Sequence, residues 1–389
     1  MQKLIKFTFI ILCFTNLTSA IAGKESKDTV IVNQATLLSQ FPDLFYEYKI
    51  AGLNAQTPLN LEYNEKVKEY IILYLNQRRA HLSEVIGLAE LYFPIFEEYL
   101  DKYGLPLELK YLPVVESGLN PKAKSATGAL GLWQFQLNSA KMFDLQITSY
   151  LDERCDPYKS TDAACRYLKY LFNMYNDWNL VMAAYNSGPG EVRDAIQRSG
   201  GNTDFWQISK WLPEQAQNYL PAFIAINYLL NYYPEHHIEP KNAQISFFDI
   251  DTLQVTHPVS FKHISETIGI SMETLRFLNP SYKLDYIPAN GHKLILILPG
   301  HFLMEFVKNE NKIYAHSNSV FEYHENSTKS SSTEKNKKIV HEVKKGEFLH
   351  KIALKYHCTI DEIIKWNELQ DSVLYEGQKL EIWISSTDY

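Results

Sequence analysis

The stretch "YLPVVESGLNP", Tyr111 to Pro121, places a single carboxylate, Glu116, after an apolar run and immediately before a chain break. Because Gly118 follows so closely, a helix that enters from Pro106 is predicted to end within a turn of the glutamate. The last carbonyls of a helix carry partial negative charge, and apolar neighbours disfavour an ionised acid. Both effects predict a raised pKa for Glu116. On this segment alone, an exposed glutamate at a helix end is the alternative.

Composition and charge limit the classes of function. The chain has 389 residues, of which 46% are hydrophobic, enough for two or three globular domains. Its formal net charge is -7, and its one notable basic run, "EKNKK", is too short to indicate a nucleic-acid partner. The 26 tyrosines suit sugar-stacking surfaces and aromatic helix packing equally well.

The N-terminus has the pattern of a secretory signal over residues 1–22. "MQKLIK" supplies positive charge, "FTFIILCF" an apolar core, and "AIA" a small-residue cleavage site ending at Ala22. A retained membrane anchor and lipidation at Cys13 are the alternatives, although Leu12 stands where a lipoprotein signal carries a small residue. The signal predicts an exported protein of the periplasm or cell envelope, with outer-membrane association left open.

Three cysteines remain after such a cleavage: Cys155, Cys165 and Cys358. Cys155 precedes a helix that Ser160 or Thr161 can cap and that carries Cys165. A loop that folds back onto this helix can bring these two sulfurs within disulfide distance, and an exported compartment permits the oxidation. A Cys155 to Cys165 disulfide and three separate buried thiols are both open, and Cys358 is unpaired in either case.

Hydrophobic periodicity divides the chain into a helical part and two smaller modules. Apolar residues recur at three- and four-residue steps through residues 40–240, which predicts an all-α domain. Residues 249–300 and 339–384 each show a strand, helix, helix, strand order, and the polar segment 301–338 between them is predicted to be a linker. "TIGISMETLRFLNP" and "YHCTIDEIIKWNEL" occupy equivalent places, which indicates a duplicated binding module.

The second module resembles the LysM family over its whole length, in "VKKGEFLHKIALKY", "IDEIIKWNEL" and "LYEGQKLEIW". LysM modules bind glycans that contain N-acetylglucosamine, such as peptidoglycan and chitin. The resemblance implies a glycan-binding groove at Gly346, Glu347, Phe348, Asn367 and Leu369. The first module matches more weakly, because "THPVSFKH" replaces the glycine-containing first loop. For that copy, a structural role and sugar binding are both open.

The helical part resembles the soluble lytic transglycosylases, whose fold is related to goose-type lysozyme. Four blocks carry the match in order: "VVESGLNPKAKSATGALGLWQFQ", "DPYKSTDAACRYL", "AAYNSGPGEV" and "EQAQNYLPAF". The expected architecture is therefore multidomain, with an all-α lysozyme-like catalytic domain followed by two small α+β modules of the LysM type. In this family Glu116 corresponds to the single catalytic acid.

The resemblance also implies a set of substrate-contacting residues. Ser125 matches a serine that contacts the reacting sugar, and Gln134 matches a glutamine on the floor of the cleft. A tyrosine and asparagine pair orients the acid and the substrate amide, and a further tyrosine lies in the last block. One position departs from the pattern, because a glutamine stands where many relatives have methionine. The full set is Ser125, Gln134, Gln136, Tyr185, Asn186 and Tyr219.

Most glycosidases use two carboxylates, whereas the four blocks offer only one. The resemblance implies that Glu116 cleaves the bond between N-acetylmuramic acid and N-acetylglucosamine and closes a 1,6-anhydro ring without water. No metal-binding motif is present, so no metal or other cofactor is expected. The implied partner is peptidoglycan, with membrane or cell-wall association. Two alternatives are a muramidase of the same fold, which uses water, and a non-catalytic protein that binds the wall.

Overall fold

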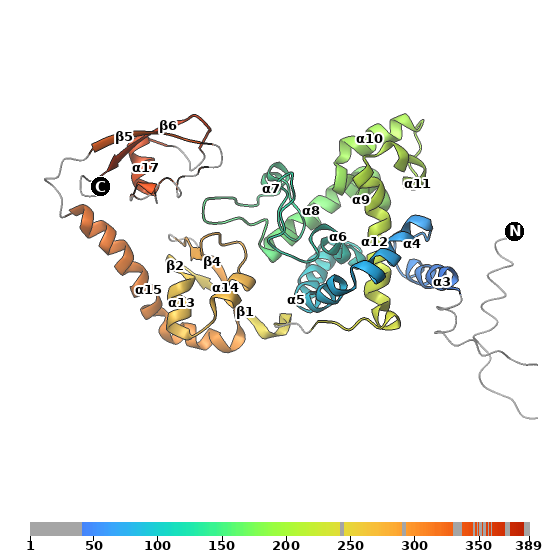
Figure 1. Ribbon diagram of the computed structural model, residues 1–389, viewed down its shortest axis with the longest axis horizontal. Helices are drawn as coiled ribbons and strands as arrows, with labels where there is room; N and C mark the ends of the chain where they lie inside the picture. Colours follow the sequence, from blue (N-terminus) through green and yellow to red (C-terminus); the bar gives the residue numbers. More distant parts are fainter. Residues whose placement is uncertain are drawn as a thin grey trace, which may run out of the picture. The chain divides into compact units, whose positions relative to one another are not determined.

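The computed structural model describes residues 41–241, 245–289, 293–329 and 337–384, the last range with gaps at 345–346, 348, 350–351, 353–354, 357, 359 and 370–373. The predicted signal segment therefore lies outside the described residues. The chain divides into two compact units, Met1–Phe45 and Tyr46–Tyr389. The second unit contains a helical domain and then small modules of helices and paired strands (Figure 1). None of the described helices is long and apolar enough to cross a membrane.

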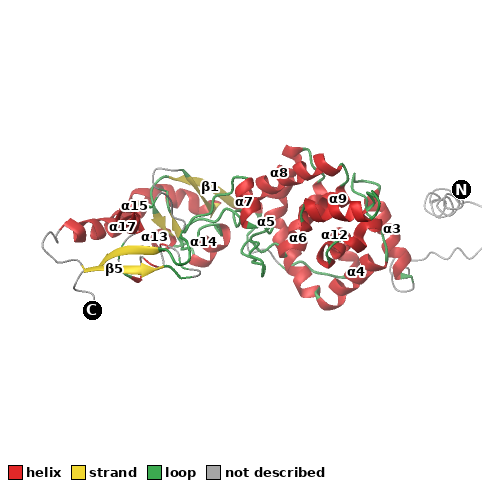
Figure 2. Ribbon diagram, turned by 90° about the horizontal axis from the view of Figure 1, so that it is seen from above, coloured by secondary structure: helices red, strands yellow, loops and turns green. Residues whose placement is uncertain are grey.

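The predicted all-α domain is confirmed. Helix α12 is its centre, since most of its side chains are buried and it packs against α4, α6 and α9 (Figure 2). The elements of this domain are α3 (Pro42–Asn54), α4 (Glu65–Gln77), α5 (Arg79–Tyr103), η1 (Leu107–Tyr111), α6 (Leu112–Ser117), α7 (Leu137–Met142), α8 (Pro157–Tyr175), α9 (Trp178–Ser187), α10 (Pro189–Arg198), α11 (Phe205–Ile208), η2 (Ser209–Trp211), α12 (Glu214–Tyr232) and η3 (Tyr233–His236).

Side-chain caps explain where several of these helices begin. The Asn64 side chain accepts a hydrogen bond from the backbone N–H of Val67 at the start of α4. Helix α8 begins with Pro157, and its cap is Asp156, not the predicted Ser160 or Thr161. The hydroxyls of those two residues donate to carbonyls one turn back, as is usual for such residues inside a helix.

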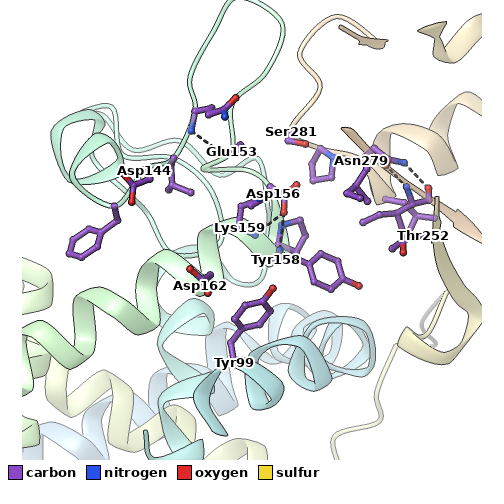
Figure 3. Close-up of a pocket in the computed structure, with 18 of the residues that line it drawn as sticks. Tyr99, Asp144, Glu153, Asp156, Tyr158, Lys159, Asp162, Thr252, Asn279 and Ser281 are labelled. Atoms are coloured by element: carbon purple, nitrogen blue, oxygen red, sulfur yellow. Dashed lines mark hydrogen bonds between the residues drawn. The ribbon is translucent and has the colours of Figure 1, made fainter. Parts of the chain in front are cut away.

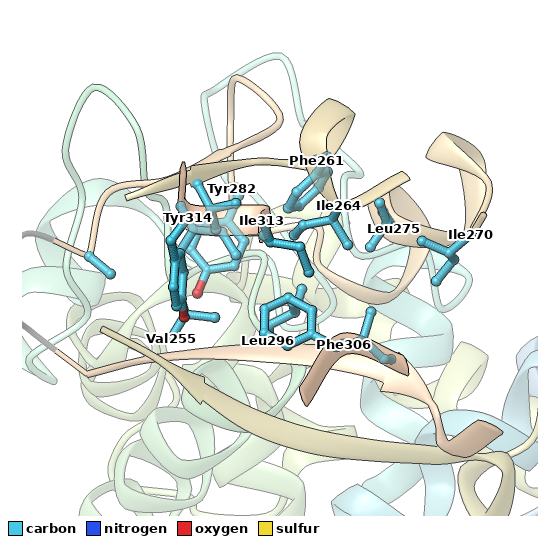
Figure 4. Close-up of a cluster of buried hydrophobic side chains, with 14 of the residues drawn as sticks. Val255, Phe261, Ile264, Ile270, Leu275, Tyr282, Leu296, Phe306, Ile313 and Tyr314 are labelled. Atoms are coloured by element: carbon cyan, nitrogen blue, oxygen red, sulfur yellow. The ribbon is translucent and has the colours of Figure 1, made fainter. Parts of the chain in front are cut away.

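The first module is built on two short antiparallel ladders. Strand β1 (Ile250–Val255) pairs with β4 (Leu294–Pro299), and β2 (Val259–Ser260) pairs with β3 (Tyr286–Ile287). After η4 (Phe247–Asp249), helices α13 (Phe261–Ile268) and α14 (Met272–Leu278) complete the element order. Figure 4 shows side chains of the strands and helices meeting in one core, which includes Val255, Phe261, Ile264, Leu275, Leu296 and Phe306.

The predicted linker over 301–338 is wrong for most of its length. Residues Gly300–Lys329 form helix α15, and Phe306, Ile313 and Tyr314 are buried in the core of the first module. Phe306 and Ile313 are separated by two helical turns, so both face the module, and this contact stabilises the helix. The module therefore extends beyond residue 300, where the prediction ended it.

The second module repeats the arrangement of the first. Strand β5 (Lys337–Glu342) pairs antiparallel with β6 (Lys379–Ile384), and α17 (Ile360–Asn367) contributes Ile363 to a core shared with Leu380 and Ile382. One asparagine amide in each module bridges the second helix and the last strand. Asn279 bonds both the N–H and the C=O of Ile297, and Asn367 does the same with Glu381. This shared asparagine bridge supports the predicted duplication of the module.

Candidate active site

Glu116 lies in the last turn of α6, as the sequence predicted. The helix ends at Gly118, whose φ of 58° is left-handed and whose N–H donates to the carbonyl of Val114 at 3.0 Å. Gly118 also lies very close to α5, because a Cβ atom built on it would stand 2.5 Å from Cε1 of His81. The left-handed backbone is what favours glycine here, since the exposed His81 ring can move away from a Cβ atom, and the resulting turn leaves the Glu116 side chain half-buried.

Burial raises the pKa of Glu116 to about 7, because water can no longer solvate the charged carboxylate well. The hydroxyl of Tyr219, on α12, donates to Oε1 of Glu116 at 2.7 Å. This hydrogen bond lowers the pKa of Glu116 and so opposes the effect of burial. Glu116 can thus hold a proton or release it near neutral pH. This balance is what a group needs if it is to act first as an acid and then as a base.

Two further hydrogen bonds hold the loop that follows the Glu116 helix, residues 119–136, which we call the site loop. The hydroxyl of Ser117 donates to the carbonyl of Leu132 at 3.0 Å, and Tyr185 on α9 donates to the carbonyl of Trp133 at 2.8 Å. Burial, and then the charge of Glu116, raises the pKa of Tyr185, so the phenol stays protonated as a donor. Helices α6 and α9 therefore bind the site loop, and α12 contacts the Glu116 carboxyl group through Tyr219.

Ser125 and Gln136 are brought together through Thr127 in the site loop. Oγ of Ser125 lies 3.0 Å from Oγ1 of Thr127, and the side-chain amide of Gln136 donates to the same Thr127 oxygen at 3.0 Å. Gln136 is exposed, whereas Ser125 is half-buried. Thr127 was not predicted as a site residue from the sequence. Its place between Ser125 and Gln136, which were both predicted to contact substrate, is the feature that could have identified it.

Gln134 has a left-handed backbone with φ 50°, which is uncommon for a residue that is not glycine. Its amide nitrogen donates to the carbonyls of Ala123 and Gly131, both at 2.9 Å. The amide donor of Gln134 is thus used within the loop, where it fixes the loop's shape. Strain of this kind is typical of functional sites when the surrounding structure holds it in place.

Asn186 follows Tyr185 on α9 and is half-buried. Its side chain has no hydrogen-bond partner among the residues for which the structure gives positions. An amide that is partly shielded from water and unused by the protein is suited to contact a ligand. Asn186 therefore differs from Gln134, whose amide donor is already engaged.

The other acids near this part of the sequence are engaged elsewhere. Asp144 pairs with Arg166, Asp152 pairs with Arg154, Glu153 accepts from the N–H of Gln146, and Asp156 caps α8. Within the described part of the chain, no second carboxylate contributes to the pKa of Glu116. The sequence-based expectation of one catalytic carboxylate is consistent with this geometry.

The predicted pairing of Cys155 and Cys165 is wrong, since both are free, buried thiols. Cys155 precedes the cap of α8, whereas Cys165 lies within the helix. A straight helix rises by about 12 Å between Pro157 and Cys165, beyond the reach of a disulfide unless the loop climbs alongside it. Cys358 is free as well, and burial raises the pKa of all three thiols.

The groove predicted in the second module is only partly within the described residues, because Gly346 and Phe348 lie outside them. The carboxylate of Glu347 accepts the N–H of Lys344 at 2.9 Å and lies 2.8 Å from Nε2 of His341. Asn367 forms the bridge already described, and Leu369 packs against the module core. These three side chains contribute to the module's own structure, and their role in binding sugar stays a prediction.

A cavity of about 570 Å³ lies where the helical domain meets the first module, away from the residues predicted for the site. Figure 3 shows Tyr99, Asp156 and Tyr158 on one wall and Asn279 and Ser281 on the other. The carboxylate of Asp156 and the amide of Asn279 are both engaged within the protein. No cluster of three or more potential metal ligands occurs in the ranges that the structure describes.

Comparison with known proteins agrees with this arrangement. Residues 94–208 match the transglycosylase SLT domain, residues 249–315 the LysM-like domain of lytic transglycosylase MltD, and residues 341–383 the LysM domain. The chain is 28% identical over 343 residues to membrane-bound lytic murein transglycosylase D of Escherichia coli (strain K12), which covers 87% of this chain and 73% of that protein.

Two further similarities cover smaller parts of the chain. The chain is 30% identical over 162 residues to the soluble lytic murein transglycosylase of Escherichia coli (strain K12), covering 39% of this chain and 24% of that protein. The crystal structure of the 70 kDa soluble lytic transglycosylase from Escherichia coli is 21% identical, with a TM-score of 0.34, over 54% of this chain and 38% of that one.

The chain thus carries a helical transglycosylase SLT domain followed by two LysM-type domains, and these domains and its relatives support a peptidoglycan lytic transglycosylase. Over 87% of its length it is similar to membrane-bound lytic murein transglycosylase D. The family resemblances drawn from the four blocks and from the LysM pattern are thus confirmed.

Proposed function

We propose that this enzyme cleaves the β-1,4 bond between N-acetylmuramic acid and N-acetylglucosamine in peptidoglycan and leaves a 1,6-anhydro-N-acetylmuramic acid end. The proposal rests on the state of the Glu116 carboxyl group. Burial raises its pKa to about 7, although the hydrogen bond from Tyr219 lowers that pKa. Such a group can transfer a proton in either direction near neutral pH.

The proposed reaction uses Glu116 twice. The protonated carboxyl first donates to the glycosidic oxygen, so the bond to the anomeric carbon breaks and the N-acetylglucosamine side leaves with the proton. The N-acetyl group of the muramic acid assists at the anomeric carbon. The Glu116 carboxylate then takes the proton of the C6 hydroxyl, whose oxygen closes the ring onto that carbon. Glu116 ends as it began, and no water is consumed.

The isolation of Glu116 favours this route over hydrolysis. Inverting glycosidases need a second carboxylate to activate water, and retaining ones need it as a nucleophile. The neighbouring acids of the site are held by Arg154, Arg166 or backbone N–H groups. A C6 hydroxyl held beside the anomeric carbon has the advantage of an intramolecular reactant over free water.

The remaining site residues are proposed to bind the sugar chain. Asn186 offers an amide that forms no hydrogen bond with the described residues and that suits the substrate's N-acetyl group, and Tyr185 fixes the site loop beside Glu116. Ser125 and Gln136 present hydroxyl and amide groups through their shared contact with Thr127. Gln134 is proposed to shape the sugar-contacting surface of the loop.

The two C-terminal modules and the N-terminal signal suggest where the enzyme acts. We propose that the protein is exported to the periplasm or cell envelope and that the LysM domain at residues 341–383 concentrates it on peptidoglycan. Similarity to a protein described as a membrane-bound lytic murein transglycosylase supports an envelope location. Nucleic acid is not a proposed partner, since the chain has a formal net charge of -7.

Digestion of purified sacculi tests the reaction directly. The released muropeptides are expected to carry 1,6-anhydro ends, which are lighter than the hydrolysed products by one water, so mass spectrometry separates the two. Products that can be reduced with borohydride would instead establish a muramidase. Absence of any release by the folded protein would indicate a wall-binding protein without activity.

Tyr219→Phe is expected to move the alkaline limb of the pH profile of kcat/KM to higher pH. The tyrosine hydroxyl lowers the pKa of Glu116, so its removal raises that pKa and keeps the acid protonated to higher pH. We expect kcat to fall about tenfold from the loss of one hydrogen bond to a charged group. Tyr228→Phe is the control, because that tyrosine lies on the same helix but contacts His236.

A further inference from the structure

We propose that the first LysM-type module braces the site loop of the catalytic domain, with Lys283, Asp152 and Arg154 as positioning residues. This inference rests on the proposed function, since it concerns how the same site holds its glycan. The first module then supports the catalytic site itself, which is a different role from attaching the enzyme to the cell wall.

The module is joined to the catalytic domain by a β-type contact. Leu151 and Tyr282 form an antiparallel bridge, in which the N–H of Asp152 donates to the carbonyl of Ser281 at 2.9 Å and the N–H of Lys283 donates to the carbonyl of Tyr150 at 2.8 Å. The side chain of Leu151 is buried as a member of the module's own core. A residue of the catalytic domain therefore completes the core of the module.

A second contact zone keeps the module from pivoting about this bridge. Apolar side chains of α5 and of the module meet there around a space of about 10 Å³, too small for a ligand. They include Leu91, Tyr92, Ile95, Ile250, Phe277 and Ile297. Two separate contacts of different chemistry fix the orientation of the module on the domain, unlike the single flexible connection of a tethered binding domain.

Charged groups lead from this junction to the site loop. Nζ of Lys283 donates to the carbonyl of Thr148 at 2.6 Å and lies 3.7 Å from Oδ2 of Asp152. Asp152, only 3% exposed, holds the guanidinium of Arg154 by two hydrogen bonds of 2.9 and 2.8 Å. Because a buried carboxylate needs its cations, Lys283 and Arg154 are held by the same group.

Arg154 in turn contacts backbone carbonyls of the site loop. Its Nη1 lies 3.1 Å from the carbonyl oxygen of Gly128 and 3.4 Å from that of Phe135, the two ends of the segment that contains Gln134. Between these ends, Gly131 lies so close that an added Cβ would stand 1.8 Å from the carbonyl oxygen of Arg154. The segment is thus clamped at three points by one residue.

The opposite side of the same segment faces the catalytic acid. The carbonyls of Leu132 and Trp133 accept the hydrogen bonds from Ser117 and Tyr185, which are the neighbours of Glu116 and Asn186 in sequence. A shift of the segment would therefore move Gln134 and the sugar-contacting surface relative to Glu116. The module acts on substrate binding through the loop and not on the proton chemistry of Glu116.

The test compares steady-state kinetics of full-length variants on short, soluble peptidoglycan glycan fragments. Lys283→Ala is expected to raise KM about five- to tenfold while kcat changes less than twofold. Lys283→Arg should restore most of the affinity, because a guanidinium can replace the ammonium beside Asp152. Lys262→Ala is the matched control, since this exposed lysine of the same module pairs only with the exposed Glu266.

Leu151→Ala tests the same idea without changing any charge. It removes the side chain that enters the module's core and is expected to raise KM in the same way as Lys283→Ala, with folding monitored by near-ultraviolet circular dichroism. A wild-type KM in both folded variants would refute the proposal that the module positions the site loop. A loss of kcat at unchanged KM would also refute it, because that result indicates general destabilisation. Reducing ends in the wild-type products would refute the proposed reaction but leave the brace standing.

Discussion

Glu116→Gln is expected to reduce kcat on peptidoglycan by about a thousandfold or more, since in the proposed mechanism one residue supplies both proton transfers. The amide keeps the size of the side chain and can still accept the hydrogen bond from Tyr219, so the fold is retained. Release of muropeptides from purified sacculi measures the effect. The matched control is Glu153→Gln, because burial raises the pKa of this carboxyl too, yet it only accepts the N–H of Gln146.

A near wild-type rate in folded Glu116→Gln would refute the assignment of the acid. If Glu153→Gln lost activity to the same extent, the effect would be structural and not specific to the site. Together the two variants separate a catalytic carboxyl group from one that is merely buried.

The same substitution makes a prediction about stability with a definite sign. The pKa of Glu116 rises from 4.5 to about 7 on folding, so the folded state disfavours the charge. Below pH 4.5 the carboxyl is neutral in both states and imposes no electrostatic cost, whereas above pH 7 it is ionised in both and the full cost is present. Glu116→Gln should therefore stabilise the protein by up to about 3 kcal/mol at pH 8 and by little at pH 4.

Thermal unfolding across this pH range checks the prediction. A melting temperature of Glu116→Gln that exceeds the wild-type value at pH 8 but not at pH 4 is the expected pattern. An equal difference at both pH values would show that the carboxyl is not desolvated by the fold.

The parts of the site that follow from local rules were predictable from sequence. Gly118 ends the Glu116 helix because its left-handed backbone suits a glycine, and this requirement is visible in the sequence itself. The raised pKa was predicted in the right direction, although burial is its main cause in the folded protein. Local signals thus placed the acid, and tertiary packing determined its environment.

Features that depend on packing between distant segments were not predictable in this way. Arg154 and Asp152 look like ordinary loop charges in sequence, and only the fold shows that they connect Lys283 to the site loop. Asn367 was predicted to line a glycan groove because its position matches the family pattern, and only the fold shows that its amide also bridges a helix and a strand. A motif locates a residue, but the use of its polar atoms depends on which backbone groups the fold leaves unpaired.

The linker error has a related cause. The segment after residue 300 is polar in composition, which suggested an unstructured connection. Phe306, Ile313 and Tyr314 are few, but their helical spacing places them on one face against the first module. The spacing of the apolar residues predicts this segment better than its overall composition does. A few apolar residues are enough to stabilise a helix when the core of a neighbouring module can bury them.

Gly131→Ala is expected to destabilise the protein by more than about 3 kcal/mol and to abolish most activity. The φ of Gly131 is 91°, and an added Cβ would stand 1.8 Å from the carbonyl oxygen of Arg154, which is backbone and cannot rotate away. Relief requires the site loop to separate from Arg154, which breaks the clamp around Gln134. Chemical denaturation gives the stability, and the KM on short glycan fragments reports the loop.

Gly128→Ala is the control that separates the clash from backbone strain. Gly128 has nearly the same φ, 90°, but nothing lies within 4 Å of a Cβ built there. Alanine at this position should cost only the strain of a left-handed conformation, about 1–2 kcal/mol. The difference between the two variants measures the close approach of Arg154 to the site loop. If both glycines tolerate alanine equally well, the loop is not held against Arg154, and the contact that holds the segment around Gln134 is absent in solution.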